Sequence, residues 1–191
     1  MKDISLHLLD ILENSTKAGA GLVEVGFEWE KHWLTVRIAD NGPGFPDSVR
    51  DDPTDPFKTT RKERPVGLGL ALLKEAAEQT GGSLAVEGPH GKGVRIEARF
   101  DIAHLDAKPL GDLAGVLAAS LAAWPGMDLV VKVGTERDMV LDTRLVRKEL
   151  DGVPFGNTKV QAWLSEEIRH GLNGLTHWAD GVMNDALPGR R

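Results

Sequence analysis

The sequence predicts a two-layer α/β sandwich, with helices on one face of a mixed sheet, followed by a small α+β module. Apolar and polar residues alternate over residues 23–29 and 34–38, which is the period of a strand with one buried face. Apolar residues recur at helical spacing over residues 4–12. Because half-buried strands need a helical layer on their apolar face, the two patterns together predict the sandwich.

The elements expected in the first half of the chain follow from these periods and from the turn residues between them. Asp3 is placed to cap the first helix, which should run to about Ala18. Lys31 and His32 should make the turn of a hairpin. The remaining expected elements are a helix over residues 67–79 and strands over residues 84–86 and 94–100.

The residue composition and pattern change at about residue 105. An Ala- and Leu-rich helix, a hairpin and two further helices are expected after this point. We therefore divide the chain into three parts. Residues 1–104 form the sandwich, 105–176 form a separate α+β module of unassigned role, and 177–191 are a polar, disordered tail. Residues 42–66 are long and irregular, which is typical of a lid or a binding loop.

Composition restricts the possible functions. The chain has 191 residues, 41% hydrophobic and 27% charged, which is an ordinary globular balance. The formal net charge of -6 gives no electrostatic reason to expect nucleic acid as a partner. The absence of cysteine excludes disulfides and thiolate chemistry and fits a reducing cytoplasm. Neither a signal peptide nor an apolar run of the ~20 residues that span a membrane is expected.

The chain is organised around residues 40–44, Asp-Asn-Gly-Pro-Gly, which follow a predicted strand. An ionised carboxylate only accepts hydrogen bonds, so Asp40 suits a ligand that offers an amino group. Glycine allows positive φ and lets a ligand approach bare backbone. The alternative is an ordinary β-turn, since all of these residue types form turns. Taken alone the stretch favours the turn, and the patterns around it favour a binding site.

Two further patterns carry chemistry. Asp10 and Asn14 are four residues apart, so they lie on one face of the first helix. Gly67-x-Gly69 opens a predicted helix, whose N-terminus favours an anion. Each pattern also has a structural explanation, as a solvated polar stripe or as glycine that lets helices pack. The basic stretch over residues 55–64 is equally consistent with a solvated loop.

Several known phosphate-binding and hydrolytic motifs are absent. The chain has no Gly-x-x-x-x-Gly-Lys-Ser/Thr loop, no His-Glu-x-x-His and no Gly-x-Ser-x-Gly. Leu72 occupies the position of the third glycine of the dinucleotide fingerprint, and Gly67 follows a loop rather than a strand. The P-loop and the dinucleotide-binding interpretations therefore fail, and the zinc-protease and serine-hydrolase motifs give no support to those activities.

Four stretches nevertheless occur in a fixed order along residues 1–100: Asp10 and Asn14, Asp40-x-Gly42-x-Gly44, Gly67-x-Gly69, and Gly91-x-Gly93. This order resembles the ATP-binding domain shared by DNA gyrase, heat-shock chaperones, sensor histidine kinases and MutL, the GHKL superfamily or Bergerat fold. The resemblance implies a Bergerat-type sandwich that binds ATP with Mg²⁺.

The resemblance also assigns roles to single residues. Asp40 would accept the exocyclic amine of adenine, where guanine has a carbonyl. Asn14 would offer its amide oxygen to Mg²⁺, and Asp10 falls where ATP-hydrolysing members place a catalytic glutamate. The other implied nucleotide-binding residues are Gly42 and Gly44 near adenine and the lid, and Lys17, Lys58, Thr59, Thr60, Arg61, Gly67, Leu68 and Gly69 near the phosphates.

Two positions depart from the superfamily pattern. Asp10 is one methylene shorter than glutamate, which brings its direct contact with an attacking water into question. Val94 stands where threonine usually follows the last Gly-x-Gly. His7, one turn before Asp10, has two interpretations, a hydrogen bond to that carboxylate or simple packing between helices, and packing is preferred.

Within the superfamily, residues 55–61 and 67–74 look most like sensor histidine kinases. Because the domain starts at residue 1, no preceding helical hairpin with a phosphoacceptor histidine is expected. The whole chain, including Pro109–Asp112 and Phe155–Asn157, instead resembles a small family of stand-alone bacterial histidine-kinase-like ATPases, often encoded beside iron-only hydrogenase subunits. This narrower resemblance implies a protein partner, either hydrogenase-related or regulatory.

Three functions remain open. The first is an Mg-ATP-binding ATPase or switch that acts on a partner protein. The second is a protein kinase that phosphorylates Ser/Thr or His on a partner, as anti-sigma kinases of this fold do, and the third is a non-catalytic nucleotide sensor. The acid at Asp10 favours hydrolysis or phosphoryl transfer over sensing, whereas its short side chain argues the other way.

Overall fold

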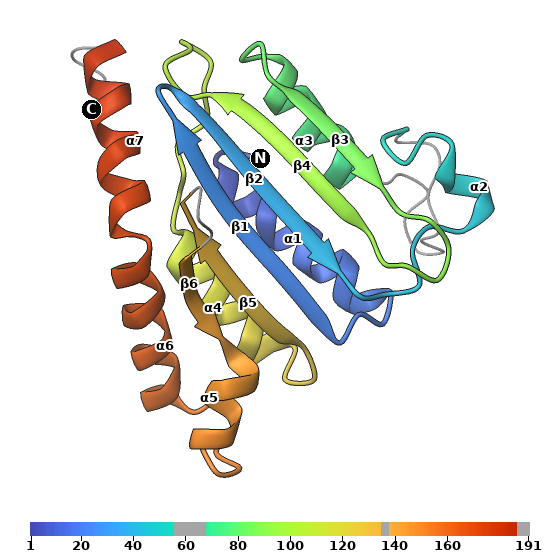
Figure 1. Ribbon diagram of the computed structural model, residues 1–191, viewed down its shortest axis with the longest axis vertical. Coiled ribbons are helices and arrows are strands. Elements are labelled where there is room, and N and C mark those ends of the chain that lie inside the picture. Colours follow the sequence, from blue (N-terminus) through green and yellow to red (C-terminus); the bar gives the residue numbers. More distant parts are fainter. Residues whose placement is uncertain (56–67, 135–137, 187–191) are drawn as a thin grey trace.

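Among the residues described by the computed structural model, 1–55, 68–134 and 138–186, six strands form one sheet in the order β3-β4-β2-β1-β5-β6 (Figure 1). The strands are β1 (Leu22–Glu30), β2 (Trp33–Asp40), β3 (Ser83–Glu87), β4 (Arg95–Asp101), β5 (Asp128–Val133) and β6 (Asp138–Asp142). The helices are α1 (Ile4–Lys17), α2 (Asp47–Arg50), α3 (Leu68–Glu78), α4 (Leu113–Ala123), α5 (Thr143–Glu149), α6 (Thr158–Gly171) and α7 (Asn173–Ala186).

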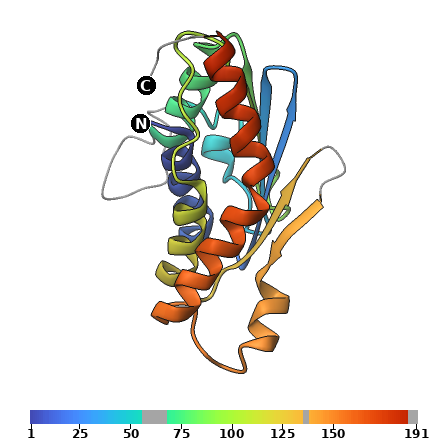
Figure 2. The same cartoon turned by 90° about the vertical axis from the view of Figure 1, so that its left-hand side faces the viewer.

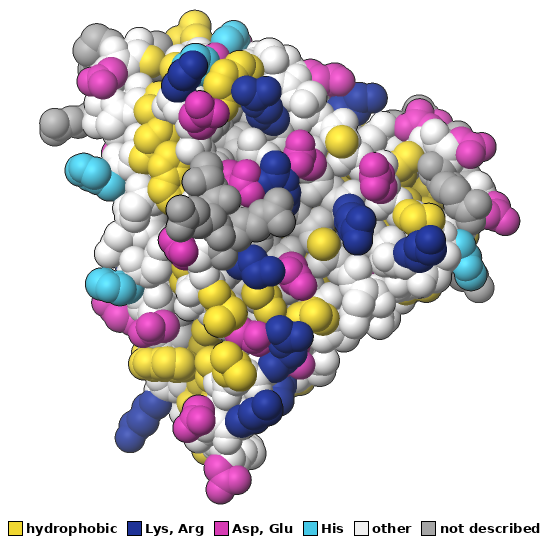
Figure 3. Space-filling model, viewed as in Figure 1, with side chains coloured by type: hydrophobic (Ala, Val, Ile, Leu, Met, Phe, Trp, Pro, Cys, Tyr) yellow, Lys and Arg dark blue, Asp and Glu magenta, His cyan; other side chains and the backbone are white. Residues whose placement is uncertain are grey.

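The protein has two layers, as the sequence predicts. Figure 2 shows the sheet from its edge, with α1, α3 and α4 against one face. The opposite face carries interspersed acidic and basic side chains (Figure 3). On that face Arg37 pairs with Glu28 and Glu97, and Lys132 pairs with Glu24 at 2.8 Å. The period-two alternation therefore marks a sheet with one apolar face under helices and one charged face.

The hairpin of β1 and β2 has the predicted position and turn. Val23, Val25 and Phe27 are at most 1% exposed, because they point from β1 into the helical layer. Phe27 pairs with Val36 across the antiparallel register. Lys31 has φ of 58°, so the tight turn depends on one left-handed residue that is not glycine.

The structure corrects the prediction of a separate C-terminal module. Strand β5 pairs in parallel with β1, which makes the sheet mixed and continues it across the expected boundary. Leu129 and Val131 of β5 are fully buried in the same apolar cluster as Leu12 and Val25. Local periodicity predicts the strand correctly, but it carries no information on which distant strand will be its neighbour.

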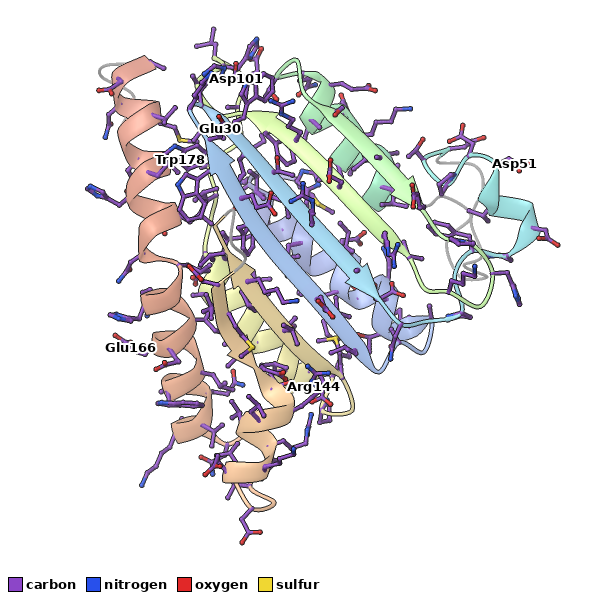
Figure 4. All side chains as sticks on the ribbon, viewed as in Figure 1. Glu30, Asp51, Asp101, Arg144, Glu166 and Trp178 are labelled. Atoms are coloured by element: carbon purple, nitrogen blue, oxygen red, sulfur yellow. The ribbon has the colours of Figure 1, made fainter. Side chains whose placement is uncertain are left out.

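Much of the predicted polar tail is also ordered, because α7 extends to residue 186. Ala179 is 2% exposed, and the Nε1 of Trp178 donates to the carbonyl oxygen of Lys31 at 2.9 Å (Figure 4). The Trp178 ring lies 5.9 Å from that of Trp29, which fixes α7 beside the hairpin. No helix within the described ranges has both the length and the apolarity needed to cross a bilayer.

A fragment ending at Ala103 tests whether the first 103 residues fold alone. The fragment loses β5, which covers the edge of β1, and α4, which packs against α1. Because an unpaired strand edge and an uncovered apolar helix face favour aggregation, we expect no cooperative thermal unfolding and a large-particle profile in size-exclusion chromatography. A chain ending at Ala186 keeps every described element and serves as the control. A fragment that melts cooperatively as a monomer would contradict the single-core description.

Candidate functional site

A cavity of about 460 Å³ lies between α1, the end of β2, the start of α3 and the start of β4. Its wall is mostly apolar, and its polar side chains come from α1 and from the end of β2. Such a combination of apolar surface with few polar groups is typical of a small-molecule site. The lining residues are Ile11, Asn14, Ser15, Lys17, Ala18, Asp40, Pro43, Gly44, Phe45, Pro46, Val49, Pro53, Gly69, Leu70, Val94 and Ile96.

The carboxylate of Asp40 is held in a fixed orientation at this cavity. Its Oδ2 accepts from the hydroxyl of Ser15 at 2.7 Å. Its Oδ1 accepts from the backbone N–H groups of Gly42 at 2.9 Å and Val94 at 3.1 Å. Because an ionised carboxylate has roughly four lone-pair positions, it retains acceptor capacity for a ligand after these three hydrogen bonds.

The loop after β2 packs directly on the turn over residues 88–93, and two glycines make this possible. Gly44 has φ of 75°, and a Cβ there would lie 2.4 Å from the carbonyl oxygen of Pro89. Gly93 has φ of 76°, and a Cβ there would lie 1.9 Å from the carbonyl oxygen of Asp40. Only glycine fits these approaches, so both glycine-containing stretches support Asp40.

The polar face of α1 meets the start of α3 without intervening side chains. The Nδ2 of Asn14 donates to the Oδ2 of Asp10 at 3.0 Å. A Cβ on Gly69 would lie 1.8 Å from that same Oδ2 and 3.4 Å from the Nδ2 of Asn14. Asn14 lines the cavity, and Asp10, its hydrogen-bond acceptor, is not among the described lining residues. Glycine is required at position 69 because α1 packs closely on the start of α3, in addition to any role of its backbone N–H group in binding a ligand.

The other residues predicted to lie near the phosphates differ in their positions. Lys17 lines the cavity with a 60% exposed side chain, and it pairs with Glu13. Leu68 is the first residue of α3 and is 51% exposed. The predicted residues Lys58, Thr59, Thr60, Arg61 and Gly67 lie outside the described residues.

His7 has the packing role that the sequence favoured. Its side chain is 3% exposed, and neither ring nitrogen makes a hydrogen bond, so it does not hold Asp10. Burial lowers the pKa of His7 to about 4, with further lowering by the N-terminal amine and Lys108 and an opposing effect of Asp3. The imidazole is therefore neutral in the folded protein at neutral pH.

Sequence reasoning missed Ser15, which provides the one side-chain donor to Asp40 among the described residues. The sequence feature that could have indicated Ser15 is its position one helical turn after Ile11, on the buried face of α1 and directly beside Asn14. The departure at Val94 has a simple explanation in the geometry. Its backbone N–H, rather than its side chain, contacts Asp40, so a valine supplies the same donor.

Comparison with known proteins identifies the first half of the chain. The family model for the histidine kinase-, DNA gyrase B-, and HSP90-like ATPase matches residues 2–104. The ATPase domain of Aquifex aeolicus MutL, solved with ADP, matches with a TM-score of 0.50 at 14% identity, covering 74% of this chain and 63% of that one. At that identity the likeness concerns the fold, and it agrees with the predicted Bergerat-type sandwich.

Curated relatives match over about half of the chain. The putative sensor histidine kinase NtrY-like protein of Rickettsia conorii is 29% identical over 109 residues, which cover 56% of this chain and 18% of that protein. The C4-dicarboxylate transport sensor protein DctB of Rhizobium meliloti is 38% identical over 89 residues, which cover 44% and 14%. The chain thus spans less than a fifth of the length of either relative.

Gly69→Ala should destabilise the protein, because the new methyl group requires Asp10 to rotate away from Asn14. We expect a loss of about 1–3 kcal/mol in the free energy of unfolding, measured by urea denaturation. Gly181→Ala is the matched control, since this helical glycine of α7 has open space around it and should gain about 0.5–1 kcal/mol. If the clash with Asp10 causes the loss, Asp10→Ala should reduce the cost of Gly69→Ala; equal costs in both backgrounds would refute this cause.

His7 should make the protein less stable in mild acid. Its pKa is about 4 in the folded state and near 6.5 when unfolded, so the unfolded state binds the extra proton as the pH falls below 6.5. Between pH 7.5 and pH 5 this linkage costs about 2 kcal/mol. Urea denaturation at both pH values should show the loss in the wild type and a smaller loss in His7→Leu. Identical pH dependence in the two proteins would rule out His7 as the cause.

Proposed function

Because the chain belongs to the histidine kinase-, DNA gyrase B- and HSP90-like ATPase family, we propose that it binds Mg-ATP in the cavity at Asp40. We further propose that it uses ATP as an ATPase or an ATP-dependent switch that acts on a partner protein. The observation that carries the proposal is the Asp40 carboxylate, oriented by Ser15, Gly42 and Val94 at the wall of an apolar cavity.

The cavity fits an adenine ring. Apolar side chains such as Ile11 and Ile96 offer a surface for the flat base, and Asp40 offers an acceptor for its exocyclic amine. Guanine has a carbonyl at the equivalent position, so its oxygen would face the carboxylate oxygens without a proton between them. The site therefore favours adenine over guanine. Gly42 and Gly44 keep the backbone beside the base free of side chains.

The polar end of the cavity fits Mg²⁺ and phosphates. The amide oxygen of Asn14 is a hard ligand of the kind that Mg²⁺ shares with phosphate groups and waters. The start of α3 offers backbone N–H groups of Leu68 and Gly69 and the positive end of a helix dipole. When bound, ATP supplies the transferable phosphoryl group. The further donors that we propose from the resemblance are Lys17, Lys58, Thr59, Thr60, Arg61 and Gly67.

Asp10 is the proposed acidic residue of the reaction, and its contacts favour an indirect role. It accepts from Asn14 and does not line the cavity, so it would hold the Mg²⁺ ligand in place. This role agrees with the shortness of aspartate relative to glutamate. Asp10 would then act as a positioning residue. It would not itself activate the attacking water, which would depend on the site with Mg-ATP bound.

A second candidate function is phosphoryl transfer to a partner protein. It is favoured by the curated relatives, which include a protein described as a putative sensor histidine kinase and a sensor protein. We propose that the partner is hydrogenase-related or regulatory, on the basis of the narrower family resemblance alone. The proposal of a bacterial origin has the same basis. The absence of cysteine supports a cytoplasmic setting.

Isothermal titration with Mg-ATP, ADP and GTP tests the proposal. The wild type should bind ATP and ADP and discriminate against GTP. Asp40→Asn should weaken ATP binding by about 1–3 kcal/mol, roughly ten- to a hundredfold, because an amide can place a donor toward the adenine amine. Asp180→Asn, at an exposed position of α7, is the control and should leave binding unchanged. Equal ATP binding by the wild type and Asp40→Asn would remove the adenine assignment.

A further inference from the structure

The C-terminal end of α1 joins the proposed nucleotide site to β5. Asn14 lines the cavity, and two residues later the hydroxyl oxygen of Thr16 contacts the sulfur of Met127 at 3.2 Å. Just beyond the helix, the carbonyl oxygen of Gly21 accepts from the backbone N–H of Asp128 at 2.8 Å. The residues that follow the magnesium-side asparagine thus contact the start of β5 directly.

The start of β5 is in turn fastened to α5. The hydroxyl of Thr143, which is fully buried, accepts from the N–H of Leu129 at 2.8 Å and donates to Asp128 at 3.0 Å. The guanidinium of Arg147 reaches the Asp128 carboxylate at 3.1 Å and the carbonyl oxygen of Met127 at 3.3 Å. A shift at residues 127–128 must therefore move α5 or break these bonds.

The N-terminal end of α1 is also attached to the C-terminal half. The N–H groups of Ile4 and Ser5 donate to the carbonyl oxygens of Pro109 and Leu110 at 3.0 and 2.9 Å. Gly111, with φ of 72°, leaves no room for a Cβ, because it would lie 2.6 Å from the Ser5 hydroxyl. The Pro-Leu-Gly-Asp motif therefore clamps α1, and α4 packs against the same helix.

A ligand in the cavity would contact three elements at once. Ser15 belongs to α1, Asp40 ends β2, and Gly69 lies in the first turn of α3. A molecule that bridges them reduces the freedom of α1 relative to the sheet. Elements that pack on α1 then undergo local unfolding less often as well. Ligand binding in the cavity and the stability of those elements are thus linked by a coupling free energy.

We propose that β5 and α5 report the occupancy of the nucleotide site through α1. Binding restrains α1, and the Thr16–Met127 and Gly21–Asp128 contacts pass this restraint to β5 and α5. The inference rests on the proposed nucleotide binding and adds the regulation of that site. Because coupling is reciprocal, a partner protein that engages β5 or α5 changes the affinity for nucleotide by the same factor.

Amide hydrogen exchange of the full chain, with and without saturating Mg-ATP, measures this coupling. The probes are the amides of Asp128 and Leu129, whose acceptors lie on Gly21 and Thr143. Helix α6 is the internal reference, because global stabilisation by a ligand slows exchange everywhere. We expect Mg-ATP to slow the two probe amides at least about fivefold more than the amides of α6.

Thr16→Val removes the hydroxyl that contacts Met127, outside the cavity lining. Thr176→Val in α7 is its matched control, since each of the two hydroxyls donates to the carbonyl oxygen four residues earlier, at 2.8 and 3.1 Å. The excess protection should disappear in Thr16→Val and persist in Thr176→Val. Should Thr16→Val not fold, Met127→Leu keeps the apolar volume and removes the sulfur that contacts the Thr16 hydroxyl.

Calorimetry on the same samples separates this inference from the proposed function. If ATP binds and the probe amides are protected no more than α6, or if Thr16→Val and Met127→Leu both keep the excess protection, the coupling is overturned and nucleotide binding stands. If calorimetry shows no binding of Mg-ATP to the wild type, both the proposed function and the coupling are overturned. Binding with excess protection that only the α1–β5 variants lose supports the coupling.

Discussion

The Asp40 carboxylate, with its three donors, is the interaction on which the site depends. A half-buried carboxylate is unfavourable unless it is hydrogen-bonded, so its donors must arrive together. They come from Ser15 on α1, from Gly42 in the loop after β2, and from Val94 just before β4. The same bonds that orient one acceptor toward the cavity therefore set the positions of a helix, a loop and a strand. Disturbing any one of the three would change the shape of the cavity as well as its charge.

Helix α1 connects this site to the rest of the molecule. Its apolar residues pack on the sheet, its polar face carries Asp10 and Asn14 against α3, and both of its ends bond to the C-terminal half. Because α1 contacts the sheet, α3 and the C-terminal half, its movement would displace several elements, since closely packed interiors transmit displacements. This explains why the family-matched residues 2–104 and the remainder of the chain share one apolar core.

The sequence motifs outside the ATPase family pattern have structural explanations in the second half of the chain. Pro109–Asp112 anchors the start of α1 and caps α4, whose residue Gly115 donates to the Asp112 side chain. Phe155 is 1% exposed beneath the Arg147 guanidinium, and Asn157 caps α6. These residues build the packing of the C-terminal half and attach it to α1.

The sequence by itself determined the local elements and much of the candidate site. Alternation along β1 and β2, helical spacing along α1 and the order of glycine and acidic motifs depend on neighbouring residues, so they can be read along the chain. Only the tertiary structure decided that β5 lies beside β1, that residues 177–186 are held by Trp178, that Ser15 donates to Asp40 and that Asp10 accepts from Asn14. Each of these depends on contacts between residues brought together by packing, or on which side of a helix faces a particular neighbour. Such pairings arise from the whole core at once, and no local period records them.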